Sequence, residues 1–101
     1  MSSQDESQLP AEPDDSETVL AQQLGPAGLE AIDHKIMTHA QPHWLKLARV
    51  LWDAMQAGDL AESDTCMALH VHRAIKLVES GLLEGQGNLL RPRWSEIRLP
   101  R

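Results

Sequence analysis

The chain of 101 residues has a formal net charge of −6 and is 42% hydrophobic, which is enough for one small domain with a modest core. It has no apolar run long enough to cross a membrane, and its N-terminus lacks the basic-then-apolar order of a signal peptide. The single cysteine, Cys66, excludes an internal disulfide and is typical of a reducing compartment. We therefore expect a cytoplasmic protein without a membrane partner.

The negative charge belongs to the N-terminal stretch. Residues 1–24 contain six acidic residues and no Lys or Arg, whereas residues 25–101 contain nine residues of each sign. Residues 1–16 are rich in Ser, Pro and acids, which predicts disorder. Residues 17–24 could form one or two helical turns if a groove receives them, because so short a helix is marginal alone. We expect residues 1–24 to be an acidic, largely disordered tail, either a solvating extension or a nucleic-acid mimic. Residues 25–101 should be the folded domain.

The first helix of the domain is predicted over residues 26–39, entered through Gly25-Pro26. Its inward stripe consists of Leu29, Ile32, Ile36, Met37 and Ala40. Asp33 lies inside this stripe, where an unpaired carboxylate would cost several kcal/mol. We therefore interpret Asp33 as a structural polar latch, held by a donor such as an indole N–H or an Arg. A catalytic role is disfavoured because no second acid, His or nucleophile stands at a defined spacing from it.

The central helix is predicted over residues 42–57, PHWLKLARVLWDAMQA. Pro42 suits the first helical turn, and Gly58 suits the exit. On a helical wheel this stretch is apolar over most of its circumference. Such a helix is normally buried on several sides, so we expect it to form the centre of the core.

The third helix is predicted to begin at an N-cap, Ser63 or Asp64, and to run to Ser80, with Gly81 at its C-terminal end. Its buried stripe should be Met67, Val71, Ala74, Ile75 and Val78, with Leu77 at the margin. Its opposite face should show Thr65, Leu69, His72, Arg73 and Lys76. Behind it, LLEGQGNLL is typical of an apolar strand, a Gly-rich turn and a second apolar strand. Residues 96–99 alternate polar and apolar as a half-buried strand does.

Three helices followed by a β-hairpin indicate a mostly α, winged-helix-like domain. The chain also resembles a narrower group through its phrases AIDHKIM, HWLKLARVLWDAM, RAIKLVESGLLEGQGNL and SEIRLP. These are similar to a bacterial family known as domain of unknown function 3658, over residues 24–100. The resembling positions are Ile32, Asp33, Trp44, Lys46, Arg73, Leu77, Val78, Gly81, Leu83, Glu84, Gly87, Leu89, Glu96, Arg98, Leu99 and Pro100. That family has no established activity, so the resemblance implies a fold and brings no mechanism.

Few residues are spaced for catalysis or metal binding. Cys66 and His70 stand four apart on one helical face, which suits two metal ligands, but no third or fourth ligand follows at a recognisable interval. Cys66 as a nucleophile would need a base and an electrophilic pocket. No glycine motif that cradles phosphates is present. We expect no catalytic residues, no metal, no cofactor and no enzymatic activity.

Two binding functions remain. The candidate surface consists of Thr65, Leu69, His72, Arg73 and Lys76 on the third helix and Arg91, Arg93 and Trp94 on the wing. The preferred hypothesis is a non-catalytic module, monomeric or weakly homodimeric, that binds a protein through an apolar patch with a polar rim. The alternative is a DNA-binding domain whose third helix and wing contact phosphates. The neutral body disfavours DNA, since duplex binding draws on basic excess. The positions of Glu79, Glu84 and Glu96 also discriminate between the two hypotheses. If these acids lie on the same side as the arginines, DNA binding is disfavoured.

Overall fold

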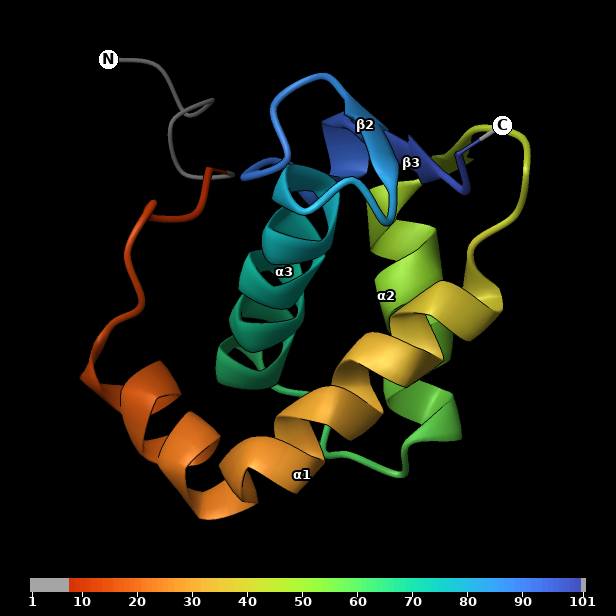
Figure 1. The fold of residues 1–101 in the computed structure, drawn as a ribbon. Helices are drawn as coiled ribbons and strands as arrows, with labels where there is room; N and C mark the ends of the chain where they lie inside the picture. The colour runs from red at the N-terminus through yellow and green to blue at the C-terminus, as the bar shows by residue number, and fades with distance from the viewer. Residues whose placement is uncertain (1–7, 101) are drawn as a thin grey trace, which may run out of the picture.

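The computed structural model describes residues 8–100 and contains three helices and one small sheet. The elements follow the order α1 (Asp15–His39), β1 (Leu45–Lys46), α2 (Leu47–Ala57), α3 (Asp64–Glu79), β2 (Glu84–Gln86), a short 3-10 helix (Pro92–Trp94) and β3 (Glu96–Arg98). The three strands are antiparallel in the order β1-β3-β2. The sheet lies at one end of α2 and α3, and α1 crosses toward their other end (Figure 1). The mostly helical architecture expected from the sequence, three helices with a small antiparallel sheet that includes the C-terminal strands, is confirmed.

Helix α1 is an elbow made of two helical arms. Gly25 interrupts it with φ 71° and ψ 177°, a conformation that essentially only glycine adopts. Pro26 then begins the second arm, residues 26–39, where its missing N–H is not needed. The first arm, residues 15–24, is capped by Asp14, whose side chain accepts a hydrogen bond from the Glu17 N–H at 2.9 Å. The sequence predicted helical turns over residues 17–24 only if a groove received them. These residues are helical in the structure, and α1 packs against α3.

The N-terminal stretch lies against the domain over its described part. The Leu9 N–H donates to the Leu90 carbonyl at 2.9 Å, and Glu17 is 3% exposed. We expected residues 1–24 to be largely disordered. Residues 1–7 lie outside the described residues, whereas residues 8–24 contact the body. Composition did not predict this. The first arm has few apolar residues, but they are enough to hold it in place because α3 supplies the surface against which they pack.

Helix α2 begins at Leu47, five residues later than predicted. Leu45 and Lys46 form β1 instead and pair with Ile97 and Glu96 of β3. The Leu47 N–H donates to the Ser95 carbonyl at 2.9 Å. The prediction failed because these backbone groups find partners in a strand fifty residues away, which helical periodicity cannot reveal.

The core is formed by apolar residues from all three helices and the sheet. Its members that are at most 2% exposed include Ile36, Leu47, Val50, Leu51, Ala54, Met55, Val71, Ala74, Leu83 and Ile97. Helix α2 is thus central, as expected. Trp52, however, is 46% exposed, so α2 is not buried around its whole apolar arc. None of the helices within residues 8–100 is long and apolar enough to span a membrane.

Helix α3 follows the prediction at its ends but not over its whole surface. The Ser63 hydroxyl accepts from the Cys66 N–H at 3.0 Å, and Gly81 follows the helix with φ 86°. Leu69, predicted to be exposed, is 4% exposed, and Leu77, predicted at the margin, is 6% exposed. The prediction for Leu69 was wrong because it took the third-helix face to be free, whereas α1 packs closely on α3.

The wing differs from the predicted strand–turn–strand. Strand β2 pairs with β3, and Glu96–Arg98 is the half-buried strand expected there. Leu89 and Leu90 form no second strand. The chain turns at Gly87, with φ 81°, and the Asn88 side chain accepts from the Leu90 N–H at 3.0 Å. This side-chain turn competes with strand pairing, and the 3-10 helix then leads into β3.

Candidate functional site

Asp33 and Arg73 join the second arm of α1 to α3. Arg73 donates from Nε and Nη2 to the two carboxylate oxygens of Asp33, at 2.9 and 2.7 Å. This is the bidentate geometry that makes arginine–carboxylate pairs both strong and directional. Hydrogen bonding to Asp33 raises the pKa of Arg73, and burial opposes that rise. The donor that Asp33 requires is therefore Arg73, from the predicted binding face. Because Arg73 is held by Asp33, it is not a freely orientable cation on that face.

His72 joins the first arm of α1 to α3. Its Nδ1 lies 2.6 Å from a Glu17 carboxylate oxygen, and its Nε2 lies 2.9 Å from the Pro10 carbonyl oxygen. The Pro10 carbonyl oxygen can only accept, so the ring nitrogen Nε2 is the donor in that contact. His72 and Glu17 side chains are 11% and 4% exposed. The contact between His72 and Glu17 is thus covered and joins the first arm to α3.

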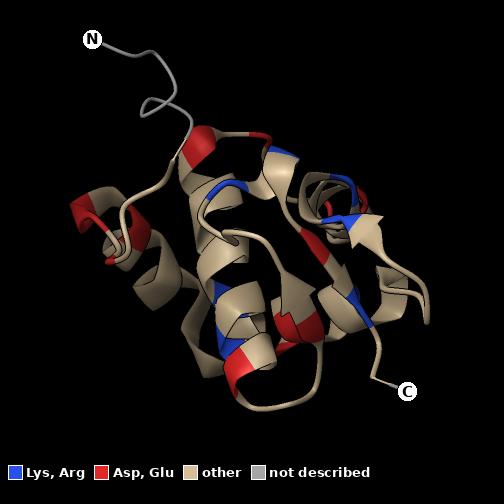
Figure 2. Ribbon diagram, turned by 90° about the horizontal axis from the view of Figure 1, so that it is seen from above, with Lys and Arg blue, Asp and Glu red and all other residues tan. Residues whose placement is uncertain are grey.

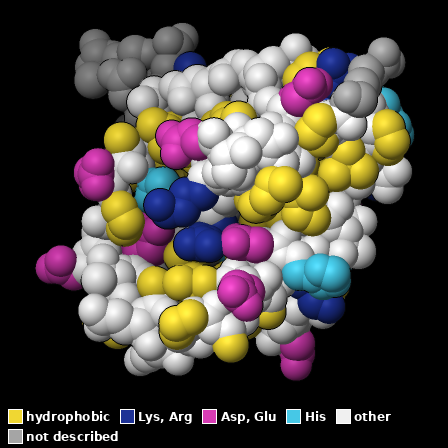
Figure 3. All heavy atoms as spheres, viewed as in Figure 1, with side chains coloured by type: hydrophobic (Ala, Val, Ile, Leu, Met, Phe, Trp, Pro, Cys, Tyr) yellow, Lys and Arg dark blue, Asp and Glu magenta, His cyan; other side chains and the backbone are white. Residues whose placement is uncertain are grey.

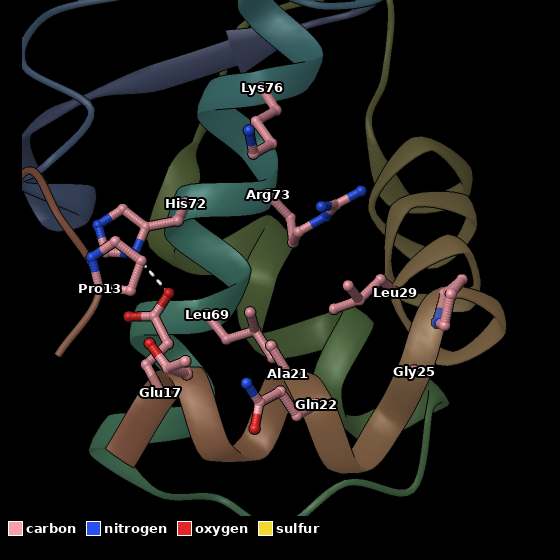
Figure 4. Close-up of a pocket in the computed structure, with 12 residues that line it drawn as sticks. Pro13, Glu17, Ala21, Gln22, Gly25, Leu29, Leu69, His72, Arg73 and Lys76 are labelled. Carbon is pink, nitrogen blue, oxygen red and sulfur yellow. Dashed lines mark hydrogen bonds and ion pairs between the residues drawn. The ribbon is translucent and has the colours of Figure 1, made fainter. Parts of the chain in front are cut away.

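The two arms of α1 and one side of α3 line an open pocket of about 490 Å³. It is lined by Pro13, Glu17, Thr18, Ala21, Gln22, Gly25, Pro26, Leu29, Leu69, His72, Arg73 and Lys76. Figure 4 shows Leu29 reaching from α1 toward α3, with Leu69 between the two helices and Lys76 beyond Arg73 along α3. We call this the elbow pocket. Its size falls within the range of about 300–1,000 Å³ typical of small-molecule sites.

The predicted binding face is divided by the structure. Leu69, His72, Arg73 and Lys76 line the elbow pocket, whereas Thr65 lines neighbouring hollows. The wing residues Arg91, Arg93 and Trp94 do not line the elbow pocket. Arg93 is exposed, Arg91 is half-buried, and Trp94 is 64% exposed. The α3 residues and the wing residues therefore form two separate candidate surfaces.

Charges of both signs are interspersed over the molecule. Figure 2 shows both Lys or Arg and Asp or Glu spread over the ribbon, and Figure 3 shows basic and acidic side chains side by side over α3, bordered by hydrophobic ones. Arg98 donates from Nε to Glu84 at 2.6 Å and lies over the Trp44 ring, 4.4 Å from its centroid. Glu96 accepts from Gln86. Glu84 and Glu96, two of the three acids whose positions discriminate between protein and DNA binding, thus lie on the sheet next to the wing.

Cys66 and His70 form a buried pair on α3. The His70 Nδ1 lies 2.8 Å from the Cys66 carbonyl oxygen and 3.8 Å from its sulfur. Burial raises the pKa of the Cys66 thiol and lowers the pKa of His70. A neutral His70 donating from Nδ1 keeps Nε2 as an acceptor, and that atom has no hydrogen-bond partner among the described residues. Over residues 8–100, no group of three His, Cys, Asp or Glu is arranged to hold a metal ion.

The functional residues that the sequence did not reveal are those of the first arm. Glu17 is the partner of His72, and Ala21 lines the elbow pocket. The available signal was the break at Gly25-Pro26 directly after a short stretch with helical apolar spacing. No protein family, curated protein or solved structure matches this chain, so its resemblance to domain of unknown function 3658 stays a prediction.

Proposed function

We propose that this protein is a non-catalytic, cytoplasmic binding module, monomeric or weakly homodimeric, whose partner is another protein. The observation that carries the proposal is Trp94, which is 64% exposed on the wing. Trp94 is the most exposed of the large hydrophobic side chains in the described part of the chain. Trp and Arg are also the residues most enriched at the energetic centres of protein interfaces, and Arg93 stands beside Trp94 in the chain.

Trp94 is held in place before any partner arrives. The Trp94 N–H donates to the Arg91 carbonyl at 2.8 Å, and the Arg91 N–H donates to the Asn88 carbonyl at 2.9 Å. Ser95 is 1% exposed, and its hydroxyl donates to the Arg91 carbonyl at 3.0 Å. A side chain presented by a fixed turn loses less conformational freedom on binding than one on a free loop. This supports a role for Trp94 as an interface anchor.

DNA binding is the alternative, and the state of α3 weighs against it. His72 and Arg73 are each engaged by a carboxylate, and Leu69 lies beneath the first arm. A duplex would have to displace these contacts before it reached α3. The observation that favours DNA is the exposed Arg93 on the wing, which could meet a phosphate. One such contact gives only weak, salt-sensitive binding.

The test compares two exposed tryptophans. Wild-type protein, Trp94→Ala and Trp52→Ala are used to capture partners from a lysate of the source cell, with and without nuclease. We expect a nuclease-resistant protein partner that Trp94→Ala loses and Trp52→Ala retains. Trp52, on α2 and 46% exposed, controls for general loss of surface aromatics. Capture that disappears with nuclease, or tight duplex binding that weakens steeply with salt, would favour the DNA alternative.

A further inference from the structure

We propose that the elbow pocket binds a small molecule with an unbranched aliphatic chain and a single carboxylate. This site lies on the other surface from Trp94 and does not depend on the wing contact. The pocket offers such a ligand an apolar wall, a cation with no partner among the described residues, and a fixed direction from one to the other.

The apolar wall comes from both arms of α1 and from α3. Ala21 belongs to the first arm, Leu29 to the second arm and Leu69 to α3, and Pro26 closes the bend. Figure 4 shows Ala21 next to Leu69, with Leu29 facing them from the second arm. A cavity of about 490 Å³ with such a lining favours an aliphatic body. Transfer of each methylene from water into it should tighten binding about fourfold.

The cation is Lys76. Of the basic residues that line the pocket, Arg73 is held by Asp33 and His72 by Glu17. Lys76 is exposed and has no hydrogen bond or ion pair to any other described residue. The one acid that lines the pocket, Glu17, is held by His72, so it does not compete with an incoming carboxylate for Lys76. Lysine acts as a point charge with rotatable donors, which suits a head group near the pocket mouth.

The two features give the ligand a direction. Lys76 lies toward the sheet end of α3, and Gly25 lies at the bend of the elbow, on the opposite side of the pocket (Figure 4). The carboxylate would therefore lie at Lys76, and the chain would point along Leu29 and Leu69 toward the bend. A longer apolar run without a charge would fill the same space but would leave Lys76 unused.

The probes are hexanoate, octanoate and octanol, titrated at fixed ionic strength into the full chain. Binding is followed by the methyl NMR signals of Ala21, Leu29 and Leu69 and by calorimetry. We expect octanoate to bind about fifteenfold more tightly than hexanoate, because two more methylenes are buried. Octanoate should also bind more tightly than octanol, and Lys76→Met should weaken octanoate binding by about two- to fivefold, as a partly exposed ion pair is worth little more.

Two matched variants make the result specific. Arg93→Gln removes a basic residue outside the pocket, and Trp94→Ala removes the proposed protein anchor, so both should bind octanoate as the wild type does. Equal affinity for octanoate and octanol, or no loss in Lys76→Met, would overturn the proposal. It would also be overturned by a lack of dependence on chain length, or by shifts confined to residues outside the pocket. A Trp94→Ala variant that loses its protein partner but keeps octanoate separates this site from the proposed function.

Discussion

Removing the Asp33 carboxylate tests how the second arm of α1 is fastened to α3. Asp33 and Arg73 side chains are 23% and 21% exposed, and two hydrogen bonds join them at 2.9 and 2.7 Å. Hydrogen bonds to charged groups contribute about 1.5–3 kcal/mol each, whereas exposed ion pairs give about 0.2–1 kcal/mol. Since this pair is mostly but not fully covered, Asp33→Ala should lower the free energy of unfolding by about 1–3 kcal/mol. Each kcal/mol lost should lower the melting temperature by about 4–8 °C.

Urea denaturation followed by tryptophan fluorescence measures this change. Arg73→Met and the double variant complete a cycle that isolates the pairwise free energy. Asp53→Ala is the matched control, because Asp53 pairs with Arg49 at 3.5 Å on the surface, with side chains 42% and 73% exposed. That variant should cost no more than about 0.5 kcal/mol. The reasoning is refuted if Asp33→Ala costs no more than Asp53→Ala, or if the cycle gives no coupling between Asp33 and Arg73.

Three further predictions concern the elbow and the buried histidine. Glu17→Ala should cost about 1–2 kcal/mol by leaving the covered His72 without its carboxylate, and should expose the first arm to limited proteolysis; an unchanged cleavage pattern would show that the arm is held otherwise. Gly25→Ala should cost about 1–3 kcal/mol in urea denaturation because alanine rarely adopts φ 71° with ψ 177°, and wild-type stability would contradict this. Burial lowers the pKa of His70 in the folded state, so on acidification below about pH 6.5 the unfolded chain takes up a proton that the folded chain does not. The free energy of unfolding should therefore decrease as the pH is lowered, by up to about 1.4 kcal/mol per pH unit, and it should decrease less steeply in His70→Gln. Equal pH dependence in the wild type and the variant would rule this out.

Local chemistry accounts for what could be predicted from the sequence. Ser63 caps α3 because a hydroxyl before a helix satisfies a free N–H, and this needs no knowledge of the rest of the fold. The same holds for the break at Gly25-Pro26. Asp33 required a donor because a carboxylate in an apolar stripe is costly unless paired. Which of the candidate donors it would meet depended on the angle between two helices, which local rules do not fix.

The features that the sequence did not reveal depend on contacts between distant segments. Leu45 and Lys46 lie in a stretch of helical periodicity, yet they form a strand because β3 offers backbone partners. Leu69 has polar neighbours on its helix face, yet it is buried because α1 packs on α3. In both cases the deciding partner lies in a distant part of the chain. Periodicity identifies an apolar face but does not identify what covers it.

The position of the first arm also changes the meaning of the acidic N-terminal charge. Counted by sequence, residues 1–24 repel nucleic acid and leave a neutral body. In the folded chain, Glu17 is the carboxylate partner of His72, and the first arm packs on the side of α3 that the sequence predicted to be a free binding face. Any ligand for that side must either displace the arm, losing the Glu17 contact and the burial of Leu69, or enter the space that the elbow leaves open. The elbow pocket meets the second condition without disrupting the fold, and Trp94 on the wing avoids the competition altogether. A partner on each of these surfaces is therefore compatible with the arm remaining in place.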